Sequence, residues 1–466
     1  RLSKFDGGHP FLYEATLGGK AMPDYGAPVK LSARVEKLTD GVFRNIDFNS
    51  EISLGQTKDR NRRLKNVLED FAKPSLNLST VSEDAIGEAY IYLIEQFAAD
   101  AGKKAGEFFT PRKVSEVVAK LAAPKDGALI CDPACGSGGM FVQCAKFVER
   151  HHESASRKLS VFGTEKTEDT VPLAKMNLAL HGLSGDIRQA NSYYEDPHHA
   201  VGAFDYVMAN PPFNVDKIKK DQLAGDRRFP FGLPKADNGN YLWIQQFYAA
   251  LAPTGRAGFV MANSAGDAGH SEKELRKQLV ESGAVDVMIA IGSNFFYTRT
   301  VPCELWFFDK GKPATLRDTV LMIDARNIYR KVTRKIYDFT PEQLQNLTAI
   351  VWLYRGQSER FLALVQSYLD RTLSEAALIA QHAAALLAAY KALVAAAAPY
   401  LKTLAKDSPI RELIKVRDAT AKACFETLDE WTSRISKQWK KPCEHKLSAQ
   451  KKRLAELDLL AHACRA

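Results

Sequence analysis

Two periodicities of hydrophobic residues alternate through the middle of the chain. From about residue 107 to 310, apolar runs of four to seven residues are separated by stretches in which apolar residues recur every three or four positions. Short apolar runs are typical of buried strands, and the second spacing is typical of amphipathic helices. The strand-like runs lie at 128–131, 159–163, 204–209, 257–261, 285–291 and 304–308, and the helix-like stretches lie at 114–121, 140–150, 170–181, 241–251 and 272–282. This alternation predicts an α/β domain with a doubly wound, mostly parallel sheet.

The two flanks of this region have only the helical spacing. On the N-terminal side, apolar residues lie three or four positions apart over 59–71, and Ser82 opens a second such stretch. On the C-terminal side, we expect two long helices, at 358–404 and 411–461, that form an antiparallel hairpin. A hairpin of this length usually packs on something, and we expect a partner helix. The predicted domains are a helical N-terminal domain, an α/β domain and a C-terminal helical hairpin for partner docking, over 1–103, 104–354 and 355–466.

Composition and charge narrow the class of protein. The 466 residues are 45% hydrophobic and 26% charged, which is the balance of a folded globular protein. Lys and Arg number 64 against 55 Asp and Glu, so the net charge of +9 suits a polyanionic partner. An Ala-rich run at 376–398 is interrupted by polar residues, and we find no unbroken apolar stretch of about 18 residues, so we expect no membrane span.

The seven cysteines form no CxxC pair and no zinc-ligand set with histidine. We therefore expect no metal site, a reducing cytoplasmic location, and Cys131 and Cys135 as small buried residues. The chain begins with Arg1 rather than Met, so we expect the natural N-terminus to be missing.

A glycine-rich turn, Asp132-Pro133-Ala134-Cys135-Gly136-Ser137-Gly138-Gly139, follows the strand-like run at 128–131 and precedes a helix-like stretch. A strand, a glycine turn and a helix N-terminus together let a ligand approach the backbone closely. Phe141 occupies the third glycine position of the dinucleotide pattern GxGxxG, and no GxxxxGK[ST] occurs, so neither a dinucleotide nor an ATP loop is indicated. The carboxylate of Asp132 instead suits a cationic group, such as an amino-acid ammonium.

Glu165 ends the next strand-like run. An acid at the end of the second strand typically accepts hydrogen bonds from ribose hydroxyls. An ammonium-binding acid together with a ribose-binding acid indicates a nucleoside that carries an amino acid. S-adenosylmethionine has that description.

Asn210-Pro211-Pro212-Phe213 directly follows the apolar run 204–209 and is the most informative motif of the chain. The two prolines fix φ and remove two backbone donors, so the turn is rigid and rich in acceptors. The Asn210 amide and the Pro211 carbonyl can accept hydrogen bonds from an exocyclic amino group, and the Phe213 ring can stack on a planar base. Taken alone, the motif also fits a Pro-Pro strand exit without chemistry.

The order of these motifs resembles one family. Gly106-Glu107-Phe108-Phe109-Thr110-Pro111-Arg112 precedes the glycine turn, Glu165 and the Asn210–Phe213 motif. This order is similar to that of the adenine-N6 group of amino-DNA methyltransferases, and more narrowly to the modification (M, HsdM) subunit of Type I restriction-modification systems. The resemblance covers nearly the whole chain. It implies a Rossmann-like class I S-adenosylmethionine-dependent methyltransferase core, and site-specific methylation of adenine N6 in DNA.

The resemblance also implies roles for individual residues. The residues implied for cofactor binding are Phe108, Phe109, Thr110, Pro111, Asp132, Pro133, Gly136, Ser137, Gly138, Glu165, Lys166, Asn191 and Ser192. The residues implied for catalysis are Asn210, Pro211, Pro212 and Phe213, and no metal is required. Many relatives have an Asp where this chain has Asn191, and the amide oxygen can still accept a bond from the amino group of the cofactor adenine.

A target adenine cannot be reached inside a duplex, so we expect it to be flipped out at a cost of about a few kcal/mol. Phe213 would stack on one face of the base, and Tyr25 or another aromatic residue on the other. Basic clusters at 217–220 with 227–228, at 331–335 and at 437–441 are candidates for phosphate contacts, although most such clusters are solvated surface.

The resemblance implies double-stranded DNA, a specificity (S) subunit, a second M subunit and a restriction (R) subunit as partners. Recognition of the DNA sequence would belong to the S subunit, with the C-terminal hairpin as its docking element. Four alternatives stay open: methylation of cytosine N4, methylation of a release-factor glutamine, an M-like enzyme of a related phage-defence system, and a scaffold that binds S-adenosylmethionine without transfer.

Overall fold

Two compact units, Arg1–Val351 and Trp352–Ala466, make up the chain. The computed structural model describes residues 51, 55–72, 83–100, 110–151, 159–296, 302–334, 336–438 and 446–465. The boundary between the units lies three residues before the predicted boundary at 354/355. The predicted boundary at residue 103, between the N-terminal helical domain and the α/β domain, stays a prediction.

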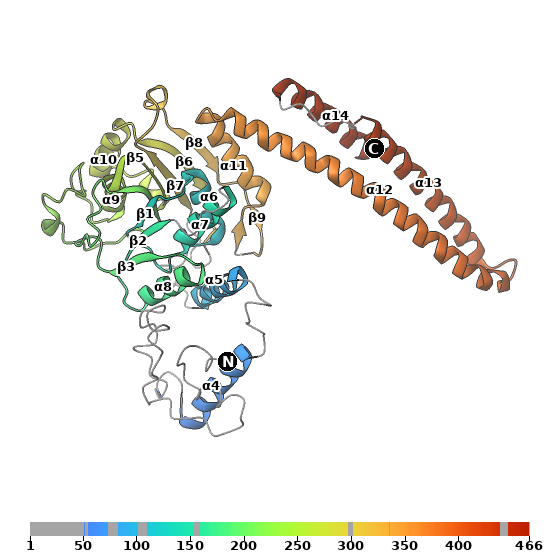
Figure 1. Ribbon diagram of the computed structural model, residues 1–466, viewed down its shortest axis with the longest axis horizontal. Helices are drawn as coiled ribbons and strands as arrows, with labels where there is room; N and C mark the ends of the chain where they lie inside the picture. The colour runs from blue at the N-terminus through green and yellow to red at the C-terminus, as the bar shows by residue number, and fades with distance from the viewer. Residues whose placement is uncertain are drawn as a thin grey trace. The chain divides into compact units, whose positions relative to one another are not determined.

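An eight-stranded sheet forms the centre of the first unit (Figure 1). Its strands are β1 (Leu129–Asp132), β2 (Ser160–Glu165), β3 (Gly185–Gln189), β4 (Phe204–Ala209), β5 (Leu251–Ala262), β6 (Val285–Ile291), β7 (Cys303–Asp309) and β8 (Leu321–Ala325). They lie in the order β3-β2-β1-β4-β5-β7-β6-β8. Neighbouring strands pair in parallel except at β7, which is antiparallel to both β5 and β6. The predicted α/β fold with a mostly parallel sheet is therefore confirmed.

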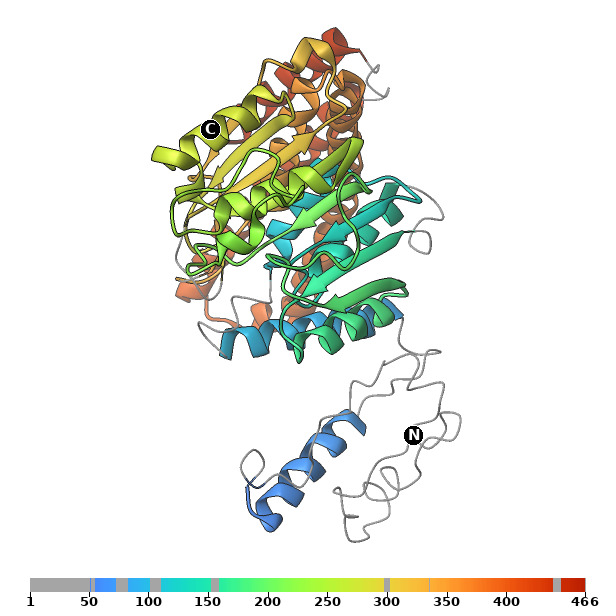
Figure 2. The same cartoon turned by 90° about the vertical axis from the view of Figure 1, so that its left-hand side faces the viewer.

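Helices cover both faces of this sheet. They are α6 (Arg112–Ala122), α7 (Gly139–His151), α8 (Thr170–Leu180), α9 (Asn240–Ala250), α10 (His270–Glu281) and α11 (Pro341–Tyr354), with 3-10 turns at Lys220–Leu223, Asn263–Ala265 and Ala314–Leu316. In Figure 1, α6 and α7 lie on one side of the strands and α9 and α10 on the other. Figure 2 shows the green α9 and the yellow-green α10 in front of the sheet. All five helices predicted between the strands are present.

The hydrophobic core under α9 is rich in aromatic side chains. Phe247 of α9 lies 4.8 Å from Phe259 of β5, measured between ring centroids, and Phe259 lies 4.9 Å from Phe308 of β7. These three residues are almost completely buried. Aromatic pairs at this separation contribute beyond the area they bury, so the core holds the carboxyl-terminal half of β4 and β5 rigidly.

Two strands at the edges of the sheet were not predicted. In β3 only Ile187 is buried, and in β8 only Ala325 is buried. β8 overlaps an apolar run at 320–323 that was not included among the predicted strands. β3, covered on one face, carries too few apolar residues to produce such a run. The two-stranded hairpin of β9 (Arg330–Lys331) and β10 (Tyr337–Asp338) was missed for the same reason, since all four residues are at least partly exposed.

Two helices precede the core, α4 (Thr57–Ala72) and α5 (Glu83–Asp100), and both were predicted. α5 packs on α8, and the Tyr90 hydroxyl donates to the Leu173 carbonyl at 3.2 Å. Glu88 accepts hydrogen bonds from Arg112 at the start of α6 and from Lys146 of α7. Helix α5 is thus bonded to the three helices that surround the glycine turn.

The second unit contains α12 (Ser358–Thr403), α13 (Pro409–Gln438) and α14 (Leu447–Arg465). Tyr390 of α12 donates to Asp418 of α13 at 2.7 Å, and Gln450 of α14 donates to the Leu362 carbonyl of α12 at 2.9 Å. The antiparallel hairpin is confirmed, but the prediction of one helix over 411–461 is wrong. Pro442 lies in the sequence between α13 and α14, and proline cannot supply a helical N–H.

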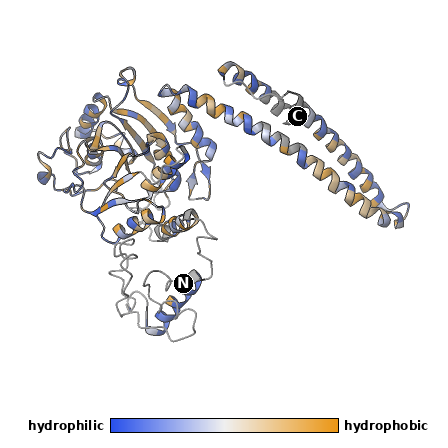
Figure 3. Ribbon diagram, viewed as in Figure 1, coloured by the Kyte–Doolittle hydropathy of each residue, from blue (hydrophilic) through white to orange (hydrophobic). Residues whose placement is uncertain are grey.

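Helix α12 also corrects the expectation about apolar segments. Its part Gln381–Thr403 is long and apolar enough to cross a membrane, judged by length and composition alone. Figure 3 shows hydrophobic positions along much of α12. Alanine, which dominates this part, keeps the mean hydropathy high in spite of the polar residues that interrupt the run. One such helix is weak evidence for a membrane span.

Candidate active site at the carboxyl edge of the sheet

The parallel strands β1, β2, β3 and β4 end at one edge of the sheet. This edge brings together the end of β1 at Asp132, the end of β2 at Glu165, and Asn191 and Asn210, which follow β3 and β4 within two residues. Ligands of open α/β sheets bind beyond the carboxyl ends of the strands. The predicted site residues that the structure describes therefore lie around one place.

The glycine turn approaches Glu165 through its backbone. Gly136 and Gly138 have φ angles of 52° and 78°, a region that side chains with a Cβ rarely adopt. This conformation directs the Gly136 N–H at the Glu165 carboxylate, at 3.1 Å. A second bond, from the Cys135 N–H to the Thr164 carbonyl at 3.0 Å, ties the turn to the end of β2. The two predicted cofactor elements are thus joined directly to each other.

Asp132 is the most strongly buried acid of the site, with 1% of its surface exposed. Its carboxylate accepts one hydrogen bond, from the Ala134 N–H at 2.9 Å. The pKa of Asp132 is raised to about 8: burial raises it most, the Ala134 bond lowers it in part, and the nearby Glu165 charge adds a smaller rise. A cationic group beside Asp132 would restore the ionised form, which fits the predicted ammonium pocket.

The segment 191–195, after β3, forms a compact turn that caps itself. The Asn191 side-chain oxygen accepts from the Tyr193 N–H at 3.2 Å, and the Glu195 carboxylate accepts from the Asn191 N–H at 2.9 Å. The Ser192 hydroxyl donates to the Pro133 carbonyl at 2.6 Å, which fastens this segment to the glycine turn. Asn191 therefore has a structural role as a capping residue, in addition to the binding role that was predicted for it.

The Asn210 amide is hydrogen-bonded through its nitrogen, whereas its oxygen has no partner among the described residues. Its Nδ2 donates to the Thr110 hydroxyl oxygen at 3.0 Å. Its Oδ1 is buried and has no hydrogen-bond partner within the part of the chain that the structure describes. An unsatisfied buried acceptor costs about 1–3 kcal/mol, so such atoms in native proteins call for an explanation. A ligand that donates a hydrogen bond would provide one.

Sequence reasoning missed two asparagines that fix the backbone directly after the Asn210–Phe213 motif. Asn214 follows Phe213 in a left-handed conformation, with φ 54°, and its N–H donates to the Asn240 side chain at 2.9 Å. Asn240, with 2% of its surface exposed, in turn donates to the Asn214 side-chain oxygen at 2.8 Å. The Asn238-Gly239-Asn240 sequence was the available signal, because asparagine and glycine cluster in loops with special backbone angles.

The other predicted residues lie as follows. Pro111 and Pro211 are buried, Pro212 and Phe213 are partly exposed, and Lys166 is exposed. The Ser137 carbonyl accepts from the Asn177 side chain of α8 at 2.8 Å. Phe108, Phe109 and Tyr25 lie outside the described residues.

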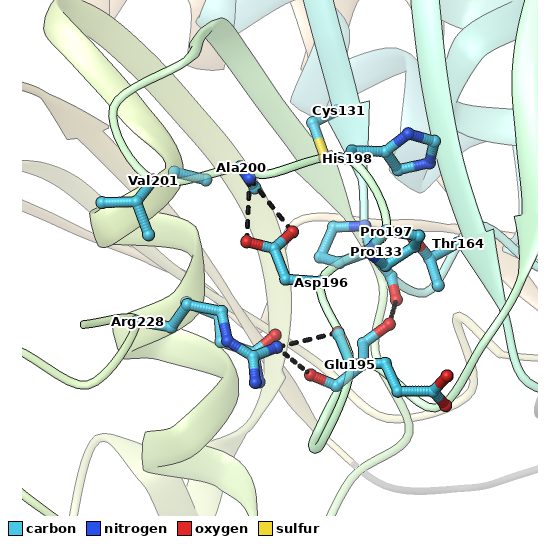
Figure 4. A pocket seen from close by; sticks show the side chains of 13 residues that line it. Cys131, Pro133, Thr164, Glu195, Asp196, Pro197, His198, Ala200, Val201 and Arg228 are labelled. Atoms are coloured by element: carbon cyan, nitrogen blue, oxygen red, sulfur yellow. Dashed lines mark hydrogen bonds between the residues drawn. The ribbon is translucent and has the colours of Figure 1, made fainter. Parts of the chain in front are cut away.

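A small cavity lies behind the 191–195 segment (Figure 4). Its volume is about 20 Å³. That volume holds about one water molecule and excludes a nucleoside. A cofactor bound by the predicted residues would therefore not lie in this cavity.

Residues 81–367 match the model of the N-6 DNA Methylase family. The chain belongs to this family. The N-6 DNA methylase chain is 31% identical over 329 residues to the Type I restriction enzyme HindI methylase subunit of Haemophilus influenzae, covering 67% of the chain and 73% of that subunit. It is 36% identical over 289 residues to the Type I restriction enzyme MjaIX methylase subunit of Methanocaldococcus jannaschii, covering 60% of the chain and 51% of that subunit. The chain thus spans about half the length of the latter relative.

A solved structure supports the fold of this N-6 DNA methylase. The methyltransferase subunit of a type I restriction-modification system from Streptococcus thermophilus is 27% identical, with a TM-score of 0.62. The match covers 69% of this chain and 68% of that chain. The Rossmann-like methyltransferase core inferred from the sequence is therefore confirmed.

Proposed function

We propose that this N-6 DNA methylase transfers a methyl group from S-adenosylmethionine to the N6 amino group of adenine in DNA, as the M subunit of a Type I restriction-modification complex. One observation carries the proposal: the Oδ1 of Asn210 is buried and has no hydrogen-bond partner among the described residues. An adenine amino group donates two hydrogen bonds and fits an acceptor site. The names of the two curated relatives support the assignment to a Type I system.

The residues of the carboxyl edge fit S-adenosylmethionine. The buried Asp132 carboxyl needs a cation to ionise near neutral pH, and the amino-acid ammonium is one. Glu165 has a second-strand position suited to ribose hydroxyls. The positive φ angles of Gly136 and Gly138 favour glycine, and glycine has no side chain that would block the approach of the cofactor to the turn. When bound, S-adenosylmethionine supplies an electrophilic methyl group on a sulfonium sulfur.

Asn210 and Pro211 would bind and orient the target base. The Asn210 Oδ1 and the Pro211 carbonyl accept the two N6–H bonds and direct the nitrogen lone pair out of the acceptor plane. These fixed oxygens also stabilise the positive charge that develops on the amine, without having to reorganise. Phe213 stacks on the face of the flipped base, and Thr110 keeps the amide from rotating.

DNA is the polyanion that the net charge of +9 suits. The exposed Lys217 and Lys219 lie in the loop that follows Phe213, so they are placed for phosphate contacts near the flipped base. We further propose the partners of such a complex: an S subunit that docks on α12 and α13, a second M subunit, and an R subunit, in the cytoplasm.

The test is transfer of labelled methyl from S-adenosylmethionine to mixed-sequence DNA, followed by nucleoside analysis, with and without the cognate S subunit. We expect N6-methyladenine, and we expect it to depend on the S subunit. Label on cytosine or on protein would overturn the assignment.

Asn210→Ala is the decisive variant. Removing the acceptor should lower kcat by at least about 100-fold, the size of a lost transition-state acceptor, while the Kd for S-adenosylmethionine stays within about twofold, since Asn210 faces the target base. Asn327→Ala, at an exposed asparagine after β8, is the matched control and should leave both unchanged. Equal loss of binding and transfer in Asn210→Ala would contradict the role.

A further inference from the structure

The loop between Phe213 and α9 carries a buried arginine. Arg228 has only 7% of its surface exposed, and a buried charge requires a full set of partners. Its Nη2 donates to the Asp226 carboxylate at 2.6 Å, and its Nε donates to the same carboxylate at 3.0 Å. Burial raises the pKa of Asp226, but the bonds from Arg228 outweigh this and hold it below its usual value. The pair is therefore ionised.

The remaining donors of Arg228 all point at the segment that follows β3. Nη1 donates to the Ser192 carbonyl at 2.7 Å and to the Glu195 carbonyl at 2.9 Å, and Nη2 donates to the Tyr193 carbonyl at 3.2 Å. Figure 4 shows the guanidinium directed at this backbone. One side chain of the loop between Phe213 and α9 thus binds three carbonyls of a single turn.

Two further contacts join the same two segments. The Lys219 N–H donates to the Tyr194 hydroxyl oxygen at 3.0 Å. A Cβ on Gly239 would lie 2.5 Å from the Tyr193 hydroxyl oxygen, so the backbone there passes closer to the turn than any side chain would allow. The loop that begins at the base-binding motif therefore rests on the 191–195 turn at three places.

The turn is in contact with the glycine loop on its other side. Asn191 and Glu195 cap its amides, Arg228 binds its carbonyls, and the Ser192 hydroxyl bonds the Pro133 carbonyl at 2.6 Å. A continuous set of hydrogen bonds thus runs from the Asp132–Gly139 turn, through 191–195, to the loop that carries Lys217 and Lys219.

We propose that Arg228 is a positioning residue that couples the cofactor segment 191–195 to the loop that follows the target-base motif. The inference rests on the proposed function. Because one guanidinium orders both segments, binding of the cofactor orders the DNA-facing loop, and binding of DNA orders the cofactor segment. Such coupling is reciprocal by thermodynamic necessity, with typical factors of about 5 to 150.

A partly buried ion pair within the sheet supplies the comparison. Arg256 of β5 donates to Asp309 of β7 at 2.8 Å, and the Asp309 side chain is 5% exposed. This pair lies toward the amino edge, away from the carboxyl ends of β1 to β4. Its loss would destabilise the fold without touching either segment, so Arg256→Gln separates stability from coupling.

The experiment measures the Kd for S-adenosylhomocysteine by calorimetry, with and without mixed-sequence duplex DNA, for the full chain in its purified complex. We expect DNA to lower this Kd at least about fivefold in the unmodified protein. In Arg228→Gln the Kd without DNA should rise at least about fivefold, and the effect of DNA should disappear. Arg228→Lys, which keeps the charge and some carbonyl bonds, should lie between. Arg256→Gln should lower Tm and keep both the Kd and the effect of DNA.

Arg228→Gln with the Kd and DNA effect of the unmodified protein would overturn the proposal, as would absence of a DNA effect in the unmodified protein. If Arg228→Gln fails to fold, Arg228→Lys and Asp226→Asn test the proposal instead. An unchanged effect of DNA on the Kd for S-adenosylhomocysteine in both variants would reject the proposal. Failure of the proposed function gives a different result. In that case no methyl appears on adenine, while the Kd values without DNA still show whether Arg228 orders the cofactor segment.

Discussion

At the residue scale, the site depends on side chains that are restrained by one neighbour and left open to a ligand. The Asn210 amide is bonded through Nδ2 to Thr110, and its Oδ1 is buried without a partner among the described residues. The Asp132 carboxyl is buried with a single backbone donor. Both groups carry an energetic cost in the free protein that a ligand with the right charge or donor would relieve.

Thr110 should control transfer through the orientation of Asn210. In Thr110→Val the hydroxyl acceptor is lost, so the amide can rotate and present its NH2 group to the base. We expect kcat to fall about tenfold, equivalent to about 1.4 kcal/mol, and Thr110→Ser to restore it because the hydroxyl returns. Single-turnover methylation measures this step. A Val variant with normal kcat would show that Asn210 does not need the Thr110 bond.

The raised pKa of Asp132 predicts a proton released on cofactor binding. With a folded-state pKa of about 8 and an ordinary value near 3.8 when unfolded, the folded protein holds an extra proton between about pH 4 and pH 8. The contribution of Asp132 therefore lowers the free energy of unfolding as pH rises through this window. A bound ammonium reverses the preference and expels the proton.

Calorimetry of cofactor binding at pH 7, in buffers that differ in ionisation enthalpy, should show release of up to about one proton. Asp132→Asn should show less, since it has no carboxyl proton to lose. Equal proton release in both proteins would rule out Asp132 as the source.

At the scale of elements, the second unit presents apolar surface along its long helices. Leu386 and Leu393 of α12 are 55% and 60% exposed. A groove of about 650 Å³ between α12 and α13 is lined by residues that include Leu387, Tyr390 and Phe425. Exposed apolar surface of this kind usually marks an interaction site, which agrees with the proposed docking of a partner helix.

The double variant Leu386→Glu/Leu393→Glu should weaken association with the S subunit at least about 100-fold, because each buried leucine contributes about 1.5–3 kcal/mol. The Kd for S-adenosylmethionine should not change. The control variant Gln381→Glu, at an exposed polar position of the same helix, adds a charge without removing apolar surface and should bind the S subunit normally. Co-purification and titration of the S subunit measure the effect. Normal binding by the double variant would exclude this face of α12.

At the scale of the whole molecule, the chain combines a sheet that carries the candidate site with a helical unit. The family match, residues 81–367, includes all eight strands and reaches into α12. The first unit contains every catalytic residue predicted, and the second contains the apolar hairpin. This division agrees with an enzyme that leaves the choice of DNA sequence to a partner, as the proposed function requires.

The core strands, the helices between them and the order of the motifs could all be predicted from the amino-acid sequence. Buried strands such as β4 and β6 are apolar on both faces, so their periodicity is visible without knowing their neighbours. The edge strand β3 could not be recognised this way, because most of its residues face solvent, whereas β8 overlaps an apolar run at 320–323 that was overlooked. The motif residues Asp132 and Asn210 could likewise be recognised, because each directly follows an apolar run.

The contacts that hold these residues in place depend on the folded chain and could not be predicted. The Thr110–Asn210 bond joins residues 100 positions apart, and the Arg228 bonds to Ser192, Tyr193 and Glu195 span at least 33. No local pattern encodes such pairs, because they depend on which strand ends meet at one edge of the sheet. Burial, which raises the pKa of Asp132 and leaves the Asn210 oxygen without a partner among the described residues, is likewise a property of packing and not of sequence spacing.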